Sequence, residues 1–310
     1  MTHTIFIDGA AGTTGLEIRE RLEGRSEFSL ILLDEAQRKD AAARAQAIND
    51  ADVVILCLPD DAAREAVSLI ANDRTRVIDA STAHRVADGW TYGFPELVGR
   101  DAVAASKRVS NPGCYPTGFL ALVGPLVRAG LIPADWPLSV NAVSGYSGGG
   151  KGMIADYEGD KAADAPSWMT YGLSLGHKHV PEMTRHAGLS VAPIFAPSVA
   201  KLLRGMIVEV PLPLGVLPGK PSATQLRDTL SAAYAGSPIV TVAGEYAGGN
   251  LPLERKSGTD GMELFVFASA DGSQARLVAA LDNLGKGASG AAVQNLNLLC
   301  GLDESAGLKL

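Results

Sequence analysis

A short apolar strand that runs directly into a glycine-rich turn and then into a helix constrains the fold more than any other feature of this sequence. Residues 4–7 (Thr-Ile-Phe-Ile) predict the strand, and Leu16, Ile18 and Leu22 follow at helical spacing. Glycines in such a turn let the backbone approach a pyrophosphate, which then rests on the helix N-terminus. The pattern predicts a dinucleotide-binding loop, with a purely structural turn as the alternative. The loop residues expected at the cofactor are Gly9, Gly12, Thr13, Thr14 and Gly15.

Beyond this helix, apolar strands alternate with amphipathic helices. The predicted strands are residues 28–33, 53–58 and 77–79, with a helix over 63–70. This alternation predicts a Rossmann-type, doubly wound parallel sheet, whose ligands gather at the carboxyl ends of the strands. Pro59 and Ser81 follow two of these strands, so we expect both beside the cofactor. Cys57 lies inside an apolar run and is assigned to the core.

Three charged residues near the end of the second predicted strand bear on which cofactor is used. Asp34 ends that strand about 20 residues after the glycine loop, where a carboxylate binds the ribose 2′-hydroxyl of NAD. Arg38 and Lys39 follow within one turn and could pair with the 2′-phosphate of NADP if Asp34 points away. These residues alone leave both cofactors open.

The second half of the chain has a different pattern, with more strands and fewer helices. The predicted strands are residues 138–144, 189–194, 205–210, 239–242 and 262–268, and the predicted helices are 224–234, 276–281 and 290–299. Such a run indicates a mixed or antiparallel sheet. We therefore expect an α/β protein with a second domain of α+β type.

Cys114 lies in a tight Pro/Gly loop, residues 110–117 (Ser-Asn-Pro-Gly-Cys-Tyr-Pro-Thr), directly before a predicted helix over 119–127. A thiolate is stabilised at a helix N-terminus by unpaired N–H groups and the helix dipole. The same N–H groups could hold an oxyanion formed when that thiolate attacks a carbonyl. The pattern favours a nucleophile, although most free cysteines are simply small buried side chains. In the loop after the predicted strand 138–144, Ser144, Ser147 and Lys151 would also suit an anion, or the loop could be a linker.

Two of the five histidines lie in one Gly/Pro-bounded segment, residues 177–182 (His-Lys-His-Val-Pro-Glu). A cysteine nucleophile needs a partner that exchanges protons near neutral pH, and imidazole suits this best. Two alternatives remain open: satisfied structural histidines, or metal ligands formed by His177, His179 and Glu182. No further His/Cys cluster completes a metal site, so we expect none.

Charge and cysteine content narrow the class of protein. The formal net charge is -7, whereas general nucleic-acid binding needs a basic surface. Three cysteines leave an odd number with no paired spacing, which favours a reducing compartment over a disulfide framework. The first residues lack the features of a signal peptide, and no stretch approaches the ~20 apolar residues of a membrane span. We expect a cytoplasmic protein with no nucleic-acid or membrane partner.

Five motifs, in this order along the chain, resemble those of N-acetyl-gamma-glutamyl-phosphate reductases in their shorter bacterial form. They are residues 9–15 (Gly-Ala-Ala-Gly-Thr-Thr-Gly), 110–117, 144–150 (Ser-Gly-Tyr-Ser-Gly-Gly-Gly), 177–182 and 283–287 (Asn-Leu-Gly-Lys-Gly). The Asn-Pro-Gly-Cys-Tyr-Pro-Thr segment is highly specific, because related acyl-phosphate enzymes such as aspartate-semialdehyde dehydrogenase carry Asn-Cys-Thr-type segments. The resemblance spans nearly the whole chain.

The resemblance implies NADPH-dependent reduction of N-acetylglutamyl 5-phosphate to the semialdehyde in arginine biosynthesis. It implies Cys114 as the nucleophile and His179 as the acid/base, with His177, Glu182 and Tyr171 in supporting roles. Arg85 and Lys151 are candidates for anchoring phosphate or carboxylate, since both lie in loops at the presumed strand ends. We further expect a small-molecule substrate and a homo-oligomer, a dimer or a tetramer.

The resemblance also implies a fold like that of glyceraldehyde-3-phosphate and semialdehyde dehydrogenases, with discontinuous domains. The expected NADP-binding domain comprises residues 1–114 and 283–310, and the catalytic domain residues 115–282. The returning segment would lie near the nicotinamide. Its expected cofactor contacts are Asn283, Gly285, Lys286 and Gly287.

Two rival functions remain open on the sequence. One is a reductase for another acyl phosphate, such as one carried on a protein in lysine biosynthesis, but no concentrated basic docking patch is visible. The other is a nucleotide-binding redox sensor in which Cys114 is oxidised rather than acylated.

Overall fold

A computed structural model describes residues 2–160 and 162–310, and the chain divides into two compact units. The first unit comprises Met1–Pro112 and Ala288–Leu308, and the second comprises Gly113–Gly287 with Lys309–Leu310. The chain therefore passes between the units three times, directly before Gly113, directly after Gly287 and directly before Lys309. No helix within the described residues has the length and apolar character that crossing a bilayer requires.

The first unit is a six-stranded parallel sheet in the order β2-β1-β3-β4-β6-β5. Its strands are β1 (His3–Asp8), β2 (Phe28–Ile31), β3 (Val53–Leu56), β4 (Arg76–Asp79), β5 (Thr91–Tyr92) and β6 (Arg108–Ser110). Its helices are α1 (Thr13–Leu22), α2 (Ala41–Asp50), α3 (Asp60–Ser68), α4 (Pro95–Val98), α5 (Arg100–Ala104) and α10 (Gly290–Leu299), with a 3₁₀ turn η1 (Gln37–Lys39). The strand predicted over residues 28–33 ends two residues earlier, because β2 ends at Ile31.

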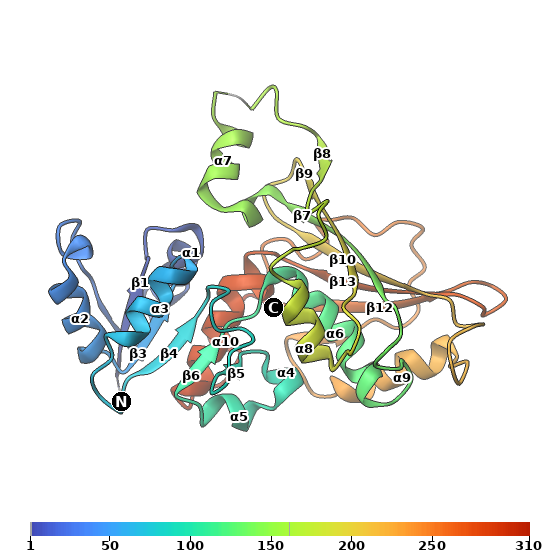
Figure 1. The fold of residues 1–310 in the computed structure, drawn as a ribbon, viewed down its shortest axis with the longest axis horizontal. Coiled ribbons are helices and arrows are strands. Elements are labelled where there is room, and N and C mark those ends of the chain that lie inside the picture. The colour runs from blue at the N-terminus through green and yellow to red at the C-terminus, as the bar shows by residue number, and fades with distance from the viewer. Residues whose placement is uncertain (1, 161) are drawn as a thin grey trace. The chain divides into compact units, whose positions relative to one another are not determined.

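Both faces of this sheet are buried, as a doubly wound fold requires. Along β1, Ile5 and Ile7 join one apolar cluster, which includes residues of α1 and α10, whereas Phe6 joins a second cluster with Ile48 of α2. Because alternate side chains of a strand point to opposite faces, a near-continuous apolar run is what a strand covered on both sides needs. Figure 1 shows α10, drawn in red, among the blue and cyan elements of this unit.

The second unit is a seven-stranded mixed sheet in the order β11-β12-β13-β10-β7-β9-β8. Its strands are β7 (Ser139–Gly145), β8 (Trp168–Thr170), β9 (Ile194–Ala200), β10 (Met206–Leu212), β11 (Val240–Val242), β12 (Met262–Ala268) and β13 (Ala275–Leu281). Its helices are α6 (Cys114–Arg128), α7 (Gly150–Glu158), α8 (Val180–Ala187) and α9 (Ala223–Ala233), with η2 (Tyr146–Gly149) and a π-helical turn η3 (Gly285–Ser289) that leads back to the first unit. α6 packs against β10 and β13 and contacts both α8 and α9. The predicted combination of a doubly wound sheet with an α+β unit is confirmed.

Two segment predictions in this unit are wrong. Residues 276–281 form most of strand β13, not a helix. β13 pairs on both sides, with β10 and β12, and all its residues except Arg276 are buried. A short strand buried on both faces shows no alternation, so its apolar run cannot be told from a buried helix by periodicity.

Residues 189–194 were predicted as a strand, but β9 begins only at Ile194. α8 ends at Gly188, which adopts a left-handed conformation with φ of 74°. The next N–H, that of Leu189, donates to the carbonyl of Thr184 and completes the helix end. This N–H is therefore not available to a sheet ladder.

Candidate functional site

Cys114 is the first residue of α6, as predicted. Gly113 caps the helix in an extended conformation, and the Thr117 hydroxyl and N–H both donate to the Gly113 carbonyl, at 2.8 and 2.9 Å. The Cys114 side chain is half-buried. A thiolate at this position faces the positive end of a fifteen-residue helix, which stabilises its charge.

A buried carboxylate holds the residue before the nucleophile. Glu182, only 1% exposed, accepts a hydrogen bond from the Gly113 N–H at 2.7 Å. Glu182 lies in the first turn of α8, and His179 is the N-cap residue of the same helix. One hydrogen bond therefore ties the N-terminus of α8 to the N-terminus of α6.

The two histidines of residues 177–182 lie against each other. His179 is buried, and its backbone N–H donates to Nδ1 of His177 at 3.2 Å. The ring centroids are 4.7 Å apart, and the His179 ring lies 6.0 Å from that of Tyr115, the residue after the nucleophile. Burial, together with the adjacent Lys178 charge, lowers the pKa of His177, so this imidazole is neutral at physiological pH. Among residues 2–160 and 162–310, no group of three or more His, Cys, Asp or Glu side chains is arranged to hold a metal.

Two tyrosines complete the surroundings of Cys114. The Tyr171 hydroxyl donates to that of Tyr115 at 3.2 Å, and the Tyr115 hydroxyl donates to the carbonyl of Ser198 at 3.1 Å. Burial, together with the nearby Cys114 charge, raises the pKa of Tyr171 to about 12. Burial likewise raises the pKa of Tyr115. Both hydroxyls are therefore protonated at neutral pH and serve as hydrogen-bond donors.

The segment over residues 282–287, which runs into η3, lies against the nucleophile within the second unit. A Cβ on Gly287 would lie 2.9 Å from the Cβ of Cys114, so only glycine fits there. Asp282 holds the turn by accepting from the Leu284 and Gly285 N–H groups, at 2.8 and 3.1 Å, and from Arg204 at 2.7 Å. This backbone is fixed rather than mobile.

Asn283 and Ser147, both predicted as ligand contacts, bind each other. The Asn283 amide donates to the Ser147 hydroxyl at 2.8 Å and accepts from the Gly205 N–H at 2.9 Å. The neighbouring Ser144 is buried, and its hydroxyl donates to the Gly145 carbonyl at 2.9 Å. Lys286 is fully buried in this segment. The loop after β7 and the segment over residues 282–287 thus form one hydrogen-bonded structure.

The two predicted anion-anchoring cations have different surroundings. Lys151 is exposed on α7. Arg85, in the first unit, is buried and donates to the carbonyls of Asn111 and Ala80, at 2.9 and 3.0 Å. Much of the Arg85 guanidinium is therefore engaged with the backbone, and its anchoring role stays a prediction.

The glycine loop of the first unit has the geometry that phosphate binding needs. Gly9 has φ of +88°, and a Cβ there would lie 2.3 Å from the Cys57 carbonyl oxygen, while one on Gly15 would lie 2.5 Å from the Gly9 carbonyl oxygen. Gly12 caps α1 without a side-chain hydrogen bond, and Thr13 and Thr14 open the helix. The first-turn N–H groups of α1 are thus presented without a competing side-chain acceptor.

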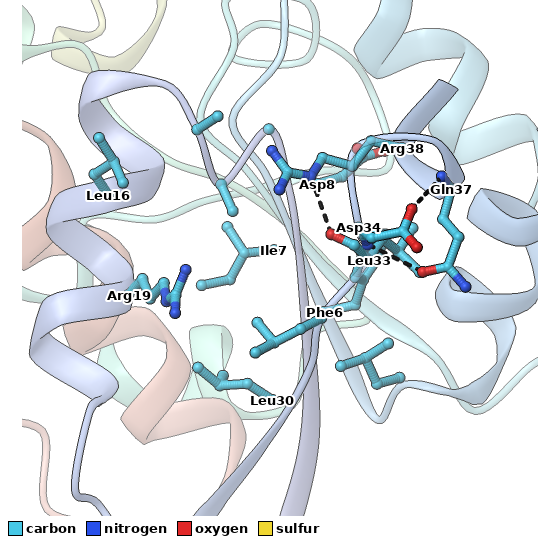
Figure 2. A pocket seen from close by; sticks show the side chains of 15 residues that line it. Phe6, Ile7, Asp8, Leu16, Arg19, Leu30, Leu33, Asp34, Gln37 and Arg38 are labelled. Carbon is cyan, nitrogen blue, oxygen red and sulfur yellow. Dashed lines mark hydrogen bonds between the residues drawn. The ribbon is translucent and has the colours of Figure 1, made fainter. Parts of the chain in front are cut away.

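A cavity of about 550 Å³ adjoins this loop; we call it the α1–β2 cavity (Figure 2). Its walls come from the ends of β1 and β2, the glycine loop and the outer face of α1. Asp34 and Arg38, two of the residues expected at the cofactor, line it, but Lys39 does not. Pro59 caps α3, and Ser81 is buried with its hydroxyl donating to Asp79 at 2.8 Å.

Sequence reasoning missed two features of the first unit. His84, which has no motif around it, lies with Nδ1 2.6 Å from Asp79 Oδ2 and stacks on Trp90 at a centroid distance of 4.1 Å. Arg19, on α1, lines the α1–β2 cavity. The only signal for Arg19 was its spacing of one turn beyond the glycine loop, which alone does not separate it from an ordinary surface arginine.

Comparisons with known proteins match both units. Residues 4–106 match the family described as "Semialdehyde dehydrogenase, NAD binding domain", and residues 114–283 match "Semialdehyde dehydrogenase, dimerisation domain". An N-acetyl-gamma-glutamyl-phosphate reductase 2 of Pseudomonas putida is 52% identical over 99% of both chains. The reductase of a Chelativorans species is 54% identical over 96% of this chain and 98% of its own. Among solved structures, aspartate semialdehyde dehydrogenase II of Vibrio cholerae has a TM-score of 0.70 at 17% identity, covering 96% of this chain and 98% of that one.

Proposed function

Because the chain belongs to the N-acetyl-gamma-glutamyl-phosphate reductase family, we propose that it reduces N-acetyl-L-glutamyl 5-phosphate to N-acetyl-L-glutamate 5-semialdehyde and phosphate, in arginine biosynthesis. The observation that carries the proposal is the hydrogen bond from Gly113 to Glu182, because it joins the helix that begins at Cys114 to the helix capped by His179. A nucleophile and an acid/base group are thereby held within one rigid unit.

Cys114 performs the first step as the nucleophile. Its thiolate attacks the acyl carbon, the carbon–oxygen bond to phosphate breaks, and a thioester to Cys114 remains while phosphate leaves. The N–H groups at the start of α6 hold the negative charge that develops on the acyl oxygen. Covalent catalysis of this kind divides one difficult reduction into two easier steps.

His179 moves the protons. It takes the thiol proton from Cys114 before attack and returns a proton when the reduced adduct on Cys114 collapses to aldehyde and thiol. Neutral His177 accepts the His179 N–H and fixes the start of α8. The Tyr171 hydroxyl, whose proton is donated to Tyr115, lies near Cys114 and can contact the substrate acyl group through its oxygen.

The first unit is the dinucleotide-binding part of the chain. We take the cofactor to be NADP(H), which supplies the hydride that reduces the thioester. The glycine loop fits a pyrophosphate, and Asp34 points into its own turn, which leaves room for a 2′-phosphate beside Arg38.

The oligomeric state and the cellular location complete the proposal. The match of residues 114–283 to a dimerisation domain supports a homo-oligomer, a dimer or a tetramer. The three cysteines are free, and Cys114 must be a thiol to act, which supports a reducing, cytoplasmic location.

The test runs the reaction in reverse. Purified protein is mixed with phosphate, NADP and either N-acetylglutamate semialdehyde or aspartate semialdehyde, and NADPH formation is followed by absorbance. We expect phosphate-dependent formation of NADPH with N-acetylglutamate semialdehyde only. A preference for aspartate semialdehyde would overturn the substrate assignment, and the absence of any Cys114 thioester by mass spectrometry would favour the redox-sensor alternative.

A further inference from the structure

The α1–β2 cavity has apolar walls that remain open to solvent. Leu16 of α1 and Leu32 beyond β2 are 42% and 60% exposed, and Ile7 and Leu30 also line the cavity. Large apolar side chains at this exposure are covered when a flat apolar group binds. An adenine ring is such a group, and the adjoining glycine loop fits the pyrophosphate of the same molecule.

The carboxylate near the end of β2 that would select NAD is hydrogen-bonded within its own turn. Asp34 Oδ1 accepts the Gln37 N–H at 2.8 Å, and the Asp34 N–H donates to the Gln37 side chain at 3.0 Å (Figure 2). These two hydrogen bonds close the turn that starts η1. One carboxylate oxygen thereby serves the loop conformation, while Asp34 remains among the residues that line the cavity.

Two guanidinium groups reach into the cavity from different elements. Arg38 Nε donates to the Leu33 carbonyl at 3.0 Å, which orients this side chain while its terminal nitrogens make no hydrogen bond to any residue that the structure describes. Arg19 comes from α1, and its side chain makes no hydrogen bond or ion pair within residues 2–160 and 162–310. Figure 2 shows them on opposite sides of the cavity.

Lys39 differs from both arginines. It is paired with Glu35 at 3.4 Å, its side chain is 78% exposed, and it does not line the cavity. The sequence placed Lys39 beside Arg38 as a phosphate ligand, but its surroundings in the structure are those of an ordinary surface ion pair.

We propose that Arg19 is a cofactor-specificity residue, which binds the adenosine 2′-phosphate of NADP together with Arg38. Two unneutralised guanidinium groups facing one cavity repel each other, and a phosphate dianion between them removes that repulsion. Each guanidinium can give the phosphate charge-assisted, bidentate hydrogen bonds. A 2′-hydroxyl offers no charge, so NAD gains nothing from Arg19. The inference rests on the proposed use of NADP.

The test measures binding of adenosine fragments rather than catalysis. The full-length protein is titrated by calorimetry with adenosine 2′,5′-bisphosphate and with 5′-AMP, as wild type and as Arg19→Ala, with NADPH in a parallel titration. Arg19→Ala should weaken the bisphosphate by about tenfold, the value of one charge-assisted contact, and leave 5′-AMP within about twofold. Lys39→Ala is the matched control, because it removes one charge from the same surface outside the cavity, and it should leave both Kd values unchanged.

The other outcomes each have a defined meaning. If Arg19→Ala weakens both fragments equally, Arg19 stacks on the adenine and the inference is overturned. The inference is also wrong if Lys39→Ala, rather than Arg19→Ala, weakens the bisphosphate selectively. If the wild type binds neither NADPH nor either fragment, the proposed use of NADP itself fails. Circular dichroism of the wild type and of each variant distinguishes a loss of binding from unfolding.

Discussion

The region around Cys114 and the α1–β2 cavity begin alike and differ in how they are completed. Each starts with glycine at the cap of a helix that has no side-chain cap. Around Cys114 the remaining groups are buried or half-buried and bonded to one another, as in the Gly113–Glu182 and Tyr171–Tyr115 pairs. Around the cavity they are exposed, and Arg19 makes no ion pair with any described residue.

This difference matches two tasks, the reaction at Cys114 and the binding of a cofactor in the cavity. A reacting sulfur needs fixed geometry, which only packed and mutually bonded neighbours provide. A cofactor that enters and leaves needs an open surface with charges ready for it. Substitutions near Cys114 should therefore reduce the rate of the chemical step, whereas those at the cavity should reduce affinity.

The sharpest contrast comes from Cys114→Ser. Turnover should be abolished while NADPH binding is retained, because serine is scarcely ionised at neutral pH. Steady-state rates and NADPH titration on the same preparation measure both.

Cys57→Ser and Cys300→Ser are the controls and should keep activity. Burial raises the pKa of Cys57 to about 12 and that of Cys300 to about 11, so neither is a thiolate near pH 7. Substantial activity in Cys114→Ser would sink the covalent mechanism.

His179→Asn should come next, lowering kcat by roughly 10²–10⁴ as general acid/base catalysis is lost. The pH–rate profile should lose one limb, since the titrating group is gone. An unchanged profile with a lowered rate would assign His179 a structural role instead.

Glu182→Ala should have an intermediate effect through position rather than chemistry. The buried Gly113 N–H loses its acceptor, at a cost of about 1–3 kcal/mol, which corresponds to a roughly 5- to 150-fold lower rate if the whole cost falls on the transition state. We expect kcat to fall while KM for the substrate changes little. Glu182→Gln keeps an acceptor and should recover part of the rate; no recovery would point to a need for the negative charge.

At the cavity, Arg38→Ala should raise KM for NADPH by about tenfold with kcat nearly unchanged. KM for NADH should stay the same, because NADH has no 2′-phosphate. If the wild type prefers NADH, the assignment of NADP is wrong. A large fall in kcat would erase the contrast between the two regions.

The smallest effect concerns acid stability. The folded-state pKa of His177 lies below 6.5, its usual value, so the unfolded chain takes up this proton first as the pH falls. The stability contributed by neutral His177 is present above about pH 6.5 and is lost as the pH falls through its folded pKa. His177→Gln should therefore show a smaller drop in Tm between about pH 7.5 and pH 5.5, measured by thermal denaturation. A steeper drop in the variant would contradict the sign of the shift.

Backbone-determined features were the most predictable part of this molecule. The glycine loop and the start of α6 at Cys114 follow from local rules for turns and helix ends, which operate within a few residues. Strand β13 was mistaken for a helix because its burial on both faces comes from β10 and β12, which lie elsewhere in the chain.

Side-chain partners were less predictable, because they depend on residues distant in sequence. Ser147 was predicted to contact a ligand, and its partner is Asn283. Asp34 was predicted to bear on the choice of cofactor, but the direction of its side chain depends on the turn it forms with Gln37. The pairing of His84 with Asp79 had no sequence signal at all.

The return of the chain to its first unit after Gly287 has a consequence for biosynthesis. The core of the first unit includes Ala292, Val293, Leu296 and Leu299 of α10, which pack with the side chains of β1, β3 and α1. On the ribosome these residues emerge only after the whole second unit has been made. The part of the first unit that comes before Gly113 is therefore made with one face of its sheet only partly covered, a state prone to aggregation. A polypeptide cut short before Gly290 would keep the glycine loop and α1, yet that face of the sheet would lack α10.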